Sequence, residues 1–127
     1  MVRIFRVNRE QVRARLRDWA QSLRDRPEVL RVILFGSCAR GDSTAASDAD
    51  VVIILRDSAL RFDERIPLYH PTGLGVSVEV FPYTVAEARR SIAEGWGVVP
   101  IALAEGQTLY AAADAPELRG GEFAASR

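Results

Sequence analysis

Two short apolar runs constrain the fold of this chain more than any other feature. Val32 to Phe35 forms the first, and Val51 to Leu55 forms the second and longest. The second run is rich in β-branched residues, which favour strands. Both are far shorter than the ~20 residues that a membrane-spanning helix needs. We therefore expect two buried strands and no membrane span.

Capping signals and periodicity place the other elements. Asn8 with Gln11, and Thr84 with Glu87, have the spacing of helix capping boxes. The first box is followed by apolar residues at helical spacing as far as about Asp25. The expected elements are an edge strand over Val2–Val7, a helix from Asn8 to about Asp25, strands over Arg31–Phe35 and Asp48–Leu55, a short helix capped by Asp57 or Ser58, a strand over Val76–Phe81, a helix from Thr84 to about Glu94, a helix over Trp96–Glu105 stopped by Gly106, and a strand over Gln107–Tyr110.

These elements predict an α/β (α+β) fold, with a small mixed sheet and helices packed on it. The 127 residues suffice for one domain with a real core. We expect that domain to span residues 1–113, and the Ala/Gly-rich residues 114–127 to form a flexible tail. No basic start with an apolar h-region is present. The expected location is cytoplasmic.

The charge balance and the rare residue types exclude several functions. The 17 basic and 17 acidic residues cancel, which argues against general nucleic-acid binding. Every basic residue is Arg, so no Lys is available as a Schiff base or in a P-loop. Cys38 is the single cysteine and His70 the single histidine, which excludes an internal disulfide and the two-His metal motifs.

The stretch FGSCARGDS directly follows the first apolar run and resembles a P-loop with Asp42 at the lysine position. Its Gly36-Ser37 turn lets backbone N–H groups approach an anion closely. Asp48 and Asp50 are two residues apart at the start of the next expected strand, so both carboxylates share a face.

Glu79 is a third carboxylate, and it interrupts an otherwise apolar strand on the face opposite Val78 and Val80. Taken singly, an Asp-x-Asp pair is commonly a solvated turn, and a strand Glu commonly faces water. Together, three carboxylates beside a Gly-Ser turn suit two Mg²⁺ ions and phosphoryl or nucleotidyl transfer.

The spacing Gly36-Ser37, ten residues, then Asp48-Ala49-Asp50 resembles the signature of the DNA polymerase β-like nucleotidyltransferase superfamily. The string GSCARGDSTAASDADVVIIL is similar to its minimal nucleotidyltransferase (MNT) branch, with Val51 in place of the usual Leu. The resemblance is tight from Val32 to Leu55 and looser as far as Glu79, where many minimal members have Asp. It implies a polymerase β palm-like fold and a transferase that releases pyrophosphate.

The resemblance also implies a role for each motif residue. Asp48, Asp50 and Glu79 would be catalytic and would ligate two Mg²⁺ ions, and Glu79 would help to draw a proton from the attacking hydroxyl. ATP or another nucleoside triphosphate would be the donor. Its phosphates would be held by Gly36, Ser37, Arg40 and Ser47.

The acceptor is expected on another chain, because only about 45 residues follow Glu79. The resemblance implies a HEPN-domain partner, with this chain as the antitoxin of a HEPN/MNT toxin–antitoxin pair that attaches AMP to a hydroxyl, in some cases of a tyrosine. A hetero-oligomer or a homodimer is compatible with this. Two alternatives stay open, namely a small-molecule transferase of the aminoglycoside type and a non-catalytic, nucleotide-binding antitoxin that acts by contact. An apolar set after the last long helix could face a partner or simply close the core: Trp96, Val98, Val99, Ile101 and Leu103.

Overall fold

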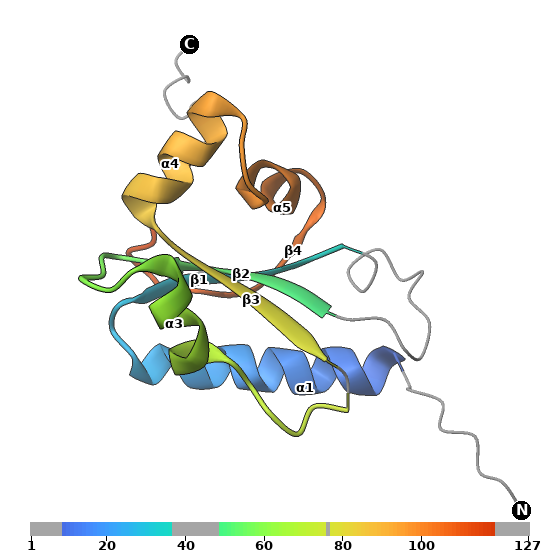
Figure 1. Ribbon diagram of the computed structural model, residues 1–127. Helices are drawn as coiled ribbons and strands as arrows, with labels where there is room; N and C mark the ends of the chain where they lie inside the picture. Colours follow the sequence, from blue (N-terminus) through green and yellow to red (C-terminus); the bar gives the residue numbers. More distant parts are fainter. Residues whose placement is uncertain (1–8, 37–48, 76, 119–127) are drawn as a thin grey trace, which may run out of the picture.

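A four-stranded mixed sheet forms the middle of the described chain (Figure 1). The computed structural model describes residues 9–36, 49–75 and 77–118. The strand order is β3-β2-β1-β4; β1 is antiparallel to both β2 and β4, whereas β2 and β3 run parallel. The expected α+β class with a small mixed sheet is therefore confirmed. The strands are β1 (Val29–Phe35), β2 (Ala49–Leu55), β3 (Val78–Thr84) and β4 (Gln107–Ala111).

Helices cover both faces of this sheet. Figure 1 shows α1 running beneath it and α4 and α5 above it, with α3 beside β3. Because β2 and β3 are parallel, the chain must cross back between them, and α3 lies within that connection. The helices are α1 (Arg9–Ser22), α3 (Phe62–Tyr69), α4 (Val85–Glu94) and α5 (Val99–Glu105), with a 3₁₀ turn over Leu23–Asp25.

The period-two alternation of the strands divides the core into two layers. On β2, Val51 and Ile53 face α1 and pack against Leu16. Val52 and Ile54 face the opposite way and pack in the layer with α4 and α5. Both layers are buried, which explains why β2 is a continuous apolar run and not an alternating one.

Several expected boundaries are confirmed and others need correction. The helix from Thr84 to Glu94 has the predicted capping box: the Glu87 amide donates to Thr84 Oγ1 and the Thr84 amide to the Glu87 carboxylate. The expected short helix is present as α3, but its predicted cap at Asp57 or Ser58 is wrong, since α3 begins at Phe62 with Arg61 as N-cap. Asp57 and Ser58 instead accept hydrogen bonds from the amides of Ser58 and Leu60, which makes a local turn.

The third strand and the helix α5 also differ from expectation. β3 begins at Val78 and continues to Thr84, three residues past the expected end at Phe81, because Pro82 and Tyr83 stay buried beside β2. The helix expected from Trp96 begins only at Val99. The positive φ of Gly97 breaks helical geometry before that point. The expected strand over Val2–Val7 and the Asn8 cap lie outside the described residues.

The described chain continues to pack after residue 113. Asp114 pairs with Arg56 at 3.0 Å, and Arg31 donates to the Pro116 carbonyl at 3.2 Å. Leu118 is 6% exposed and joins the layer of α4 and α5. The described part of the expected tail is therefore attached to the sheet.

Candidate active site

Gly36 ends β1 in a conformation that brings backbone against a carboxylate. Its φ is +82°, in the left-handed region that favours glycine. A Cβ at this position would lie 2.8 Å from Asp50 Oδ2. Only a residue without a side chain lets the turn lie this close to Asp50. The close approach that the structure shows is to Asp50, and the role of Gly36 in holding phosphate stays a prediction.

Asp50 and Glu79 are direct neighbours across the parallel pair of strands. The register aligns Phe35 with Asp50, and Asp50 with Glu79, so the three residues form one row across β1, β2 and β3. Neighbouring strands lie about 4.8 Å apart. The two predicted ligands that the structure describes are therefore brought together, on the sheet face that carries α4 and α5.

The surroundings of this row are apolar on the inner side and open on the outer side. Phe35 and Phe81 lie with ring centroids 5.9 Å apart beside the two carboxylates. Asp50 is half-buried, whereas Glu79 is exposed on the edge strand. The pair combines restricted hydration at Asp50 with open access at Glu79, as a site for metal and phosphate requires.

Ser37, Arg40, Ser47 and Asp48 lie outside the described residues, and their roles remain predictions. Within residues 9–36, 49–75 and 77–118, no group of three or more His, Cys, Asp or Glu side chains is arranged to hold a metal. Of the three predicted metal ligands, the described residues include Asp50 and Glu79.

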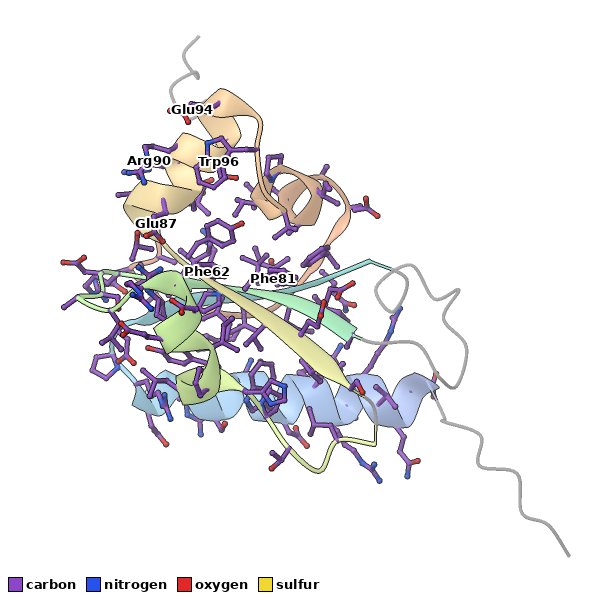
Figure 2. The ribbon with its side chains drawn as sticks, in the orientation of Figure 1. Phe62, Phe81, Glu87, Arg90, Glu94 and Trp96 are labelled. Carbon is purple, nitrogen blue, oxygen red and sulfur yellow. The ribbon has the colours of Figure 1, made fainter. Side chains whose placement is uncertain are left out.

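A cavity of about 290 Å³ borders Glu79 along the outer edge of β3. Figure 2 labels two of its aromatic residues, Phe62 from α3 and Phe81 from β3. Sequence reasoning did not connect His70 with Glu79, since no motif joins the turn after α3 to the strand that follows. The lining residues are Phe62, Ile66, His70, Val78, Glu79, Val80 and Phe81.

Arg65 is a further residue that the sequence did not single out. It is 4% exposed and sits inside α3, where it donates to the carbonyl oxygens of Leu60 and Pro82 and to both carboxylate oxygens of Glu87. The hydrogen bonds and charge of Glu87 raise the pKa of Arg65, and those of Arg65 lower the pKa of Glu87. This ion pair attaches α3 to β3 and α4, beside the cavity.

A second cluster holds the other end of α3. Tyr69 donates to Glu28 at 2.7 Å, and the guanidinium of Arg26 lies 5.0 Å from the Tyr69 ring centroid. Burial, with the hydrogen bond to Glu28, raises the pKa of Tyr69 to about 12. The phenol therefore stays protonated at neutral pH and serves to fix the helix end.

The apolar set after α4 is divided between core and surface. Val99 is fully buried in the layer of α4 and α5, and Val98 and Leu103 pack against that layer. Trp96 is 39% and Ile101 47% exposed. The Trp96 indole donates to Glu94 at 2.6 Å at the end of α4, where Figure 2 labels both residues. Two of the five residues are thus available to a partner.

None of the described helices has both the length and the apolar character needed to cross a membrane.

Comparisons with known proteins agree with the geometry. The family model described as "Nucleotidyltransferase domain" matches residues 16–107, which include Gly36, Asp50 and Glu79. No protein of curated function matches the chain significantly.

Two solved structures match the chain. A proposed nucleotidyltransferase from Sulfolobus solfataricus is 16% identical, with a TM-score of 0.60 over 87% of this chain and 90% of that one. A toxin–antitoxin structure with AMP-PNP is 17% identical, with a TM-score of 0.43 over 84% of this chain and 76% of that one. The first likeness extends over nearly the whole of both chains and supports the fold.

Proposed function

Since this chain belongs to the nucleotidyltransferase domain family, we propose that it transfers AMP from ATP to a hydroxyl of a HEPN-domain partner and so acts as its antitoxin. The general activity, nucleotidyl transfer, follows from the family. The nucleotide, the acceptor and the partner are the proposed part. The observation that carries the proposal is the side-by-side pair of Asp50 and Glu79, of which Asp50 lies against Gly36.

The donor would lie along the start of this row. Backbone at Gly36, with Ser37, Arg40 and Ser47, would hold the phosphates. Asp50, on β2, would stand next to them, and Asp48, which precedes β2 in the sequence, would join it. Because the chain has no Lys, Arg40 is the cation nearest in sequence to the turn. In nucleotidyl transfer the protein mainly positions the reactants and stabilises their charge.

The donor set fits Mg²⁺, which prefers carboxylate oxygens together with substrate phosphates. Asp50 and Glu79 supply such oxygens from adjacent strands, and Asp48 would add a third. Bound Mg²⁺ would neutralise charge on the transferred phosphoryl group and on the leaving oxygen.

The transfer would exchange one bond at the α-phosphorus and move one proton to this chain. The acceptor O–H would give its proton to Glu79, and its oxygen would form a bond to the α-phosphorus. The bond from the α-phosphorus to the bridging oxygen would break, so that pyrophosphate leaves. Glu79 is exposed and can meet an incoming hydroxyl.

The partner assignment rests on the sequence motif that resembles the minimal branch. The exposed Trp96 and Ile101 offer apolar contact area for a second protein. Modification of a partner's hydroxyl would silence the partner.

The test is incubation of the protein with α-³²P-labelled ATP, Mg²⁺ and a HEPN-domain protein as the proposed partner. We expect label on the partner, and none with Asp50→Asn. Label on an added aminoglycoside in place of the partner would favour the small-molecule alternative. Neutralisation of the partner by Asp50→Asn, without any label, would favour the non-catalytic alternative.

A further inference from the structure

The order of groups across the sheet gives the reaction a direction. The Gly36 turn follows β1, Asp50 lies on β2 and Glu79 on the edge strand β3. If the triphosphate is held at the Gly36 turn, its leaving pyrophosphate lies toward β1. Attacking and leaving oxygens stand roughly in line across the phosphorus. The attacking hydroxyl must therefore arrive from the outer side of β3.

A preformed cavity lies on that outer side. It has Glu79 in its wall, and α3 forms the opposite wall through Phe62 and Ile66. These two residues are four apart in sequence and so share a helix face. The intervening Arg65 is hydrogen-bonded to Glu87 and to the Pro82 carbonyl, which holds this wall in place.

The chemistry of the lining indicates what the cavity accepts. Five of its seven lining residues are apolar, and the two polar ones are Glu79 and His70. Its volume of about 290 Å³ is at the lower end of ligand pockets, which hold roughly 300–1,000 Å³. It offers room for one ring or one side chain, and its apolar walls cannot satisfy the many hydroxyls of a sugar.

His70 is placed to hold the polar end of such a group. It follows the last residue of α3 as the C-cap, with an extended backbone, and its side chain is exposed. In the lining it is the one polar side chain besides Glu79. An imidazole can donate or accept a hydrogen bond, so it can orient a hydroxyl without taking the proton that Glu79 receives.

We infer that the cavity between α3 and the outer edge of β3 is the acceptor subsite, and that His70 is a positioning residue for the acceptor hydroxyl. The subsite takes a hydroxyl carried on a small apolar ring and discriminates against sugar hydroxyls. The inference rests on the proposed function, because the line of attack is fixed by the donor's place at Gly36.

A binding experiment tests the subsite without catalysis. His70 is the single histidine, so its imidazole C–H resonances report on the two cavities that it lines, this one and a second one that Leu68 also lines. We expect p-cresol to shift them saturably, and methyl glucoside to leave them unchanged. Leu68 lines the second cavity and Ile66 lines this one, so the p-cresol shift should persist in Leu68→Ala and weaken in Ile66→Ala. Absence of a p-cresol shift, or an equal shift with the glucoside, would overturn the inference.

A kinetic experiment tests the role of His70, with labelled ATP as donor and the partner protein as acceptor. We expect His70→Ala to raise the KM for the partner about tenfold, the size of one hydrogen bond. The KM for ATP should not change, and His70→Gln should recover part of the loss. Wild-type protein that transfers no label would refute the proposed function, and this inference with it. Normal transfer with an unchanged partner KM in His70→Ala would refute the inference alone.

Discussion

Gly36 shows how one missing side chain shapes this site. Its φ of +82° and the 2.8 Å approach of a built Cβ to Asp50 Oδ2 are two separate constraints. Gly73 shares the first constraint, with a φ of +73°, but nothing lies within 4 Å of its Cβ position. The chain thus contains its own control for separating backbone strain from contact with the carboxylate.

We predict that Gly36→Ala abolishes transfer, whereas Gly73→Ala leaves it intact. Both variants should lose about 1 kcal/mol or more of stability from positive φ. Only Gly36→Ala should also displace Asp50. Urea unfolding and the labelled-ATP assay measure the two effects. Equal activity in the two variants would show that close approach at Gly36 is not needed.

We expect substitutions at Asp50 and Glu79 to lower the reaction rate more than the stability of the fold. Asp50→Asn and Glu79→Gln should each lower kcat by about 10²-fold or more, because a neutral amide neither ligates Mg²⁺ well nor accepts the proton. Thermal unfolding should change little for Glu79→Gln, since the side chain is exposed. Asp18→Asn, on the exposed face of α1, is the matched control and should keep full activity.

At the scale of elements, α3 shows where sequence patterns mislead. Asp57 and Ser58 have the residue types of a helix N-cap, but their side chains bond to nearby amides and form a turn. Arg61 begins the helix, and its amide donates to Glu64. The Thr84–Glu87 box was predicted correctly because there the spacing and the residue types agree with the following helix.

The Arg65–Glu87 pair attaches α3 to the rest of the fold, and its removal should be costly. We predict that Arg65→Met destabilises the protein by about 2–3 kcal/mol. This is less than the roughly 3–5 kcal/mol of a fully buried pair, because the Glu87 side chain is 27% exposed. Urea denaturation at pH 7 measures the loss. A loss below about 0.5 kcal/mol would mean that the pair behaves as a surface ion pair.

The same pair predicts a pH dependence. Arg65 holds the pKa of Glu87 below its ordinary value of 4.5. The stabilisation is therefore present above pH 4.5 and is lost as the pH falls through the lowered pKa of the folded state. Between pH 5 and more acidic pH, the free energy of unfolding should fall less in Glu87→Gln than in wild type, because the glutamine does not titrate. Urea unfolding at several pH values measures this. The difference should become smaller in the Arg65→Met background, where the hydrogen bonds of Thr84 still lower the pKa of Glu87. An unchanged difference there would assign the effect to another group.

On the scale of the whole molecule, the chain after residue 113 belongs to the packed structure as far as it is described. Leu118 fills part of the layer with α4 and α5, and Arg89 donates to the carbonyl of Glu117 at 3.0 Å. The composition of residues 114–127, rich in Ala and Gly, gave no sign of these contacts, because they use backbone carbonyls and one leucine.

We predict that Leu118→Ala lowers the free energy of unfolding by about 2 kcal/mol, the lower end of the usual cost of a buried Leu→Ala change. Leu60→Ala, at a position that is 41% exposed, should cost less than about 1 kcal/mol. Chemical denaturation measures both. Equal losses in the two variants would mean that the packing of Leu118 contributes no stability.

The sequence predicted the four described strands and the α+β class, because hydrophobic alternation is a local signal, and the motif resemblance grouped Asp50 with Glu79 as site residues. It did not predict that their strands are neighbours. It could not predict that His70 and Phe62 meet Glu79 at the edge of β3, since that contact depends on how the crossover through α3 closes. Arg65 was equally hidden, because a buried arginine inside a helix looks like a solvated one in sequence.

Pro82 limits the pairing of the β3 edge with a strand of another copy of this protein. It lies in β3, has no N–H to offer, and its carbonyl already accepts from Arg65. An exposed strand edge would otherwise be a template on which a second sheet could polymerise. Pro82 and the guanidinium of Arg65 therefore block strand pairing partway along β3. The part of the edge that remains accessible is the one beside Glu79.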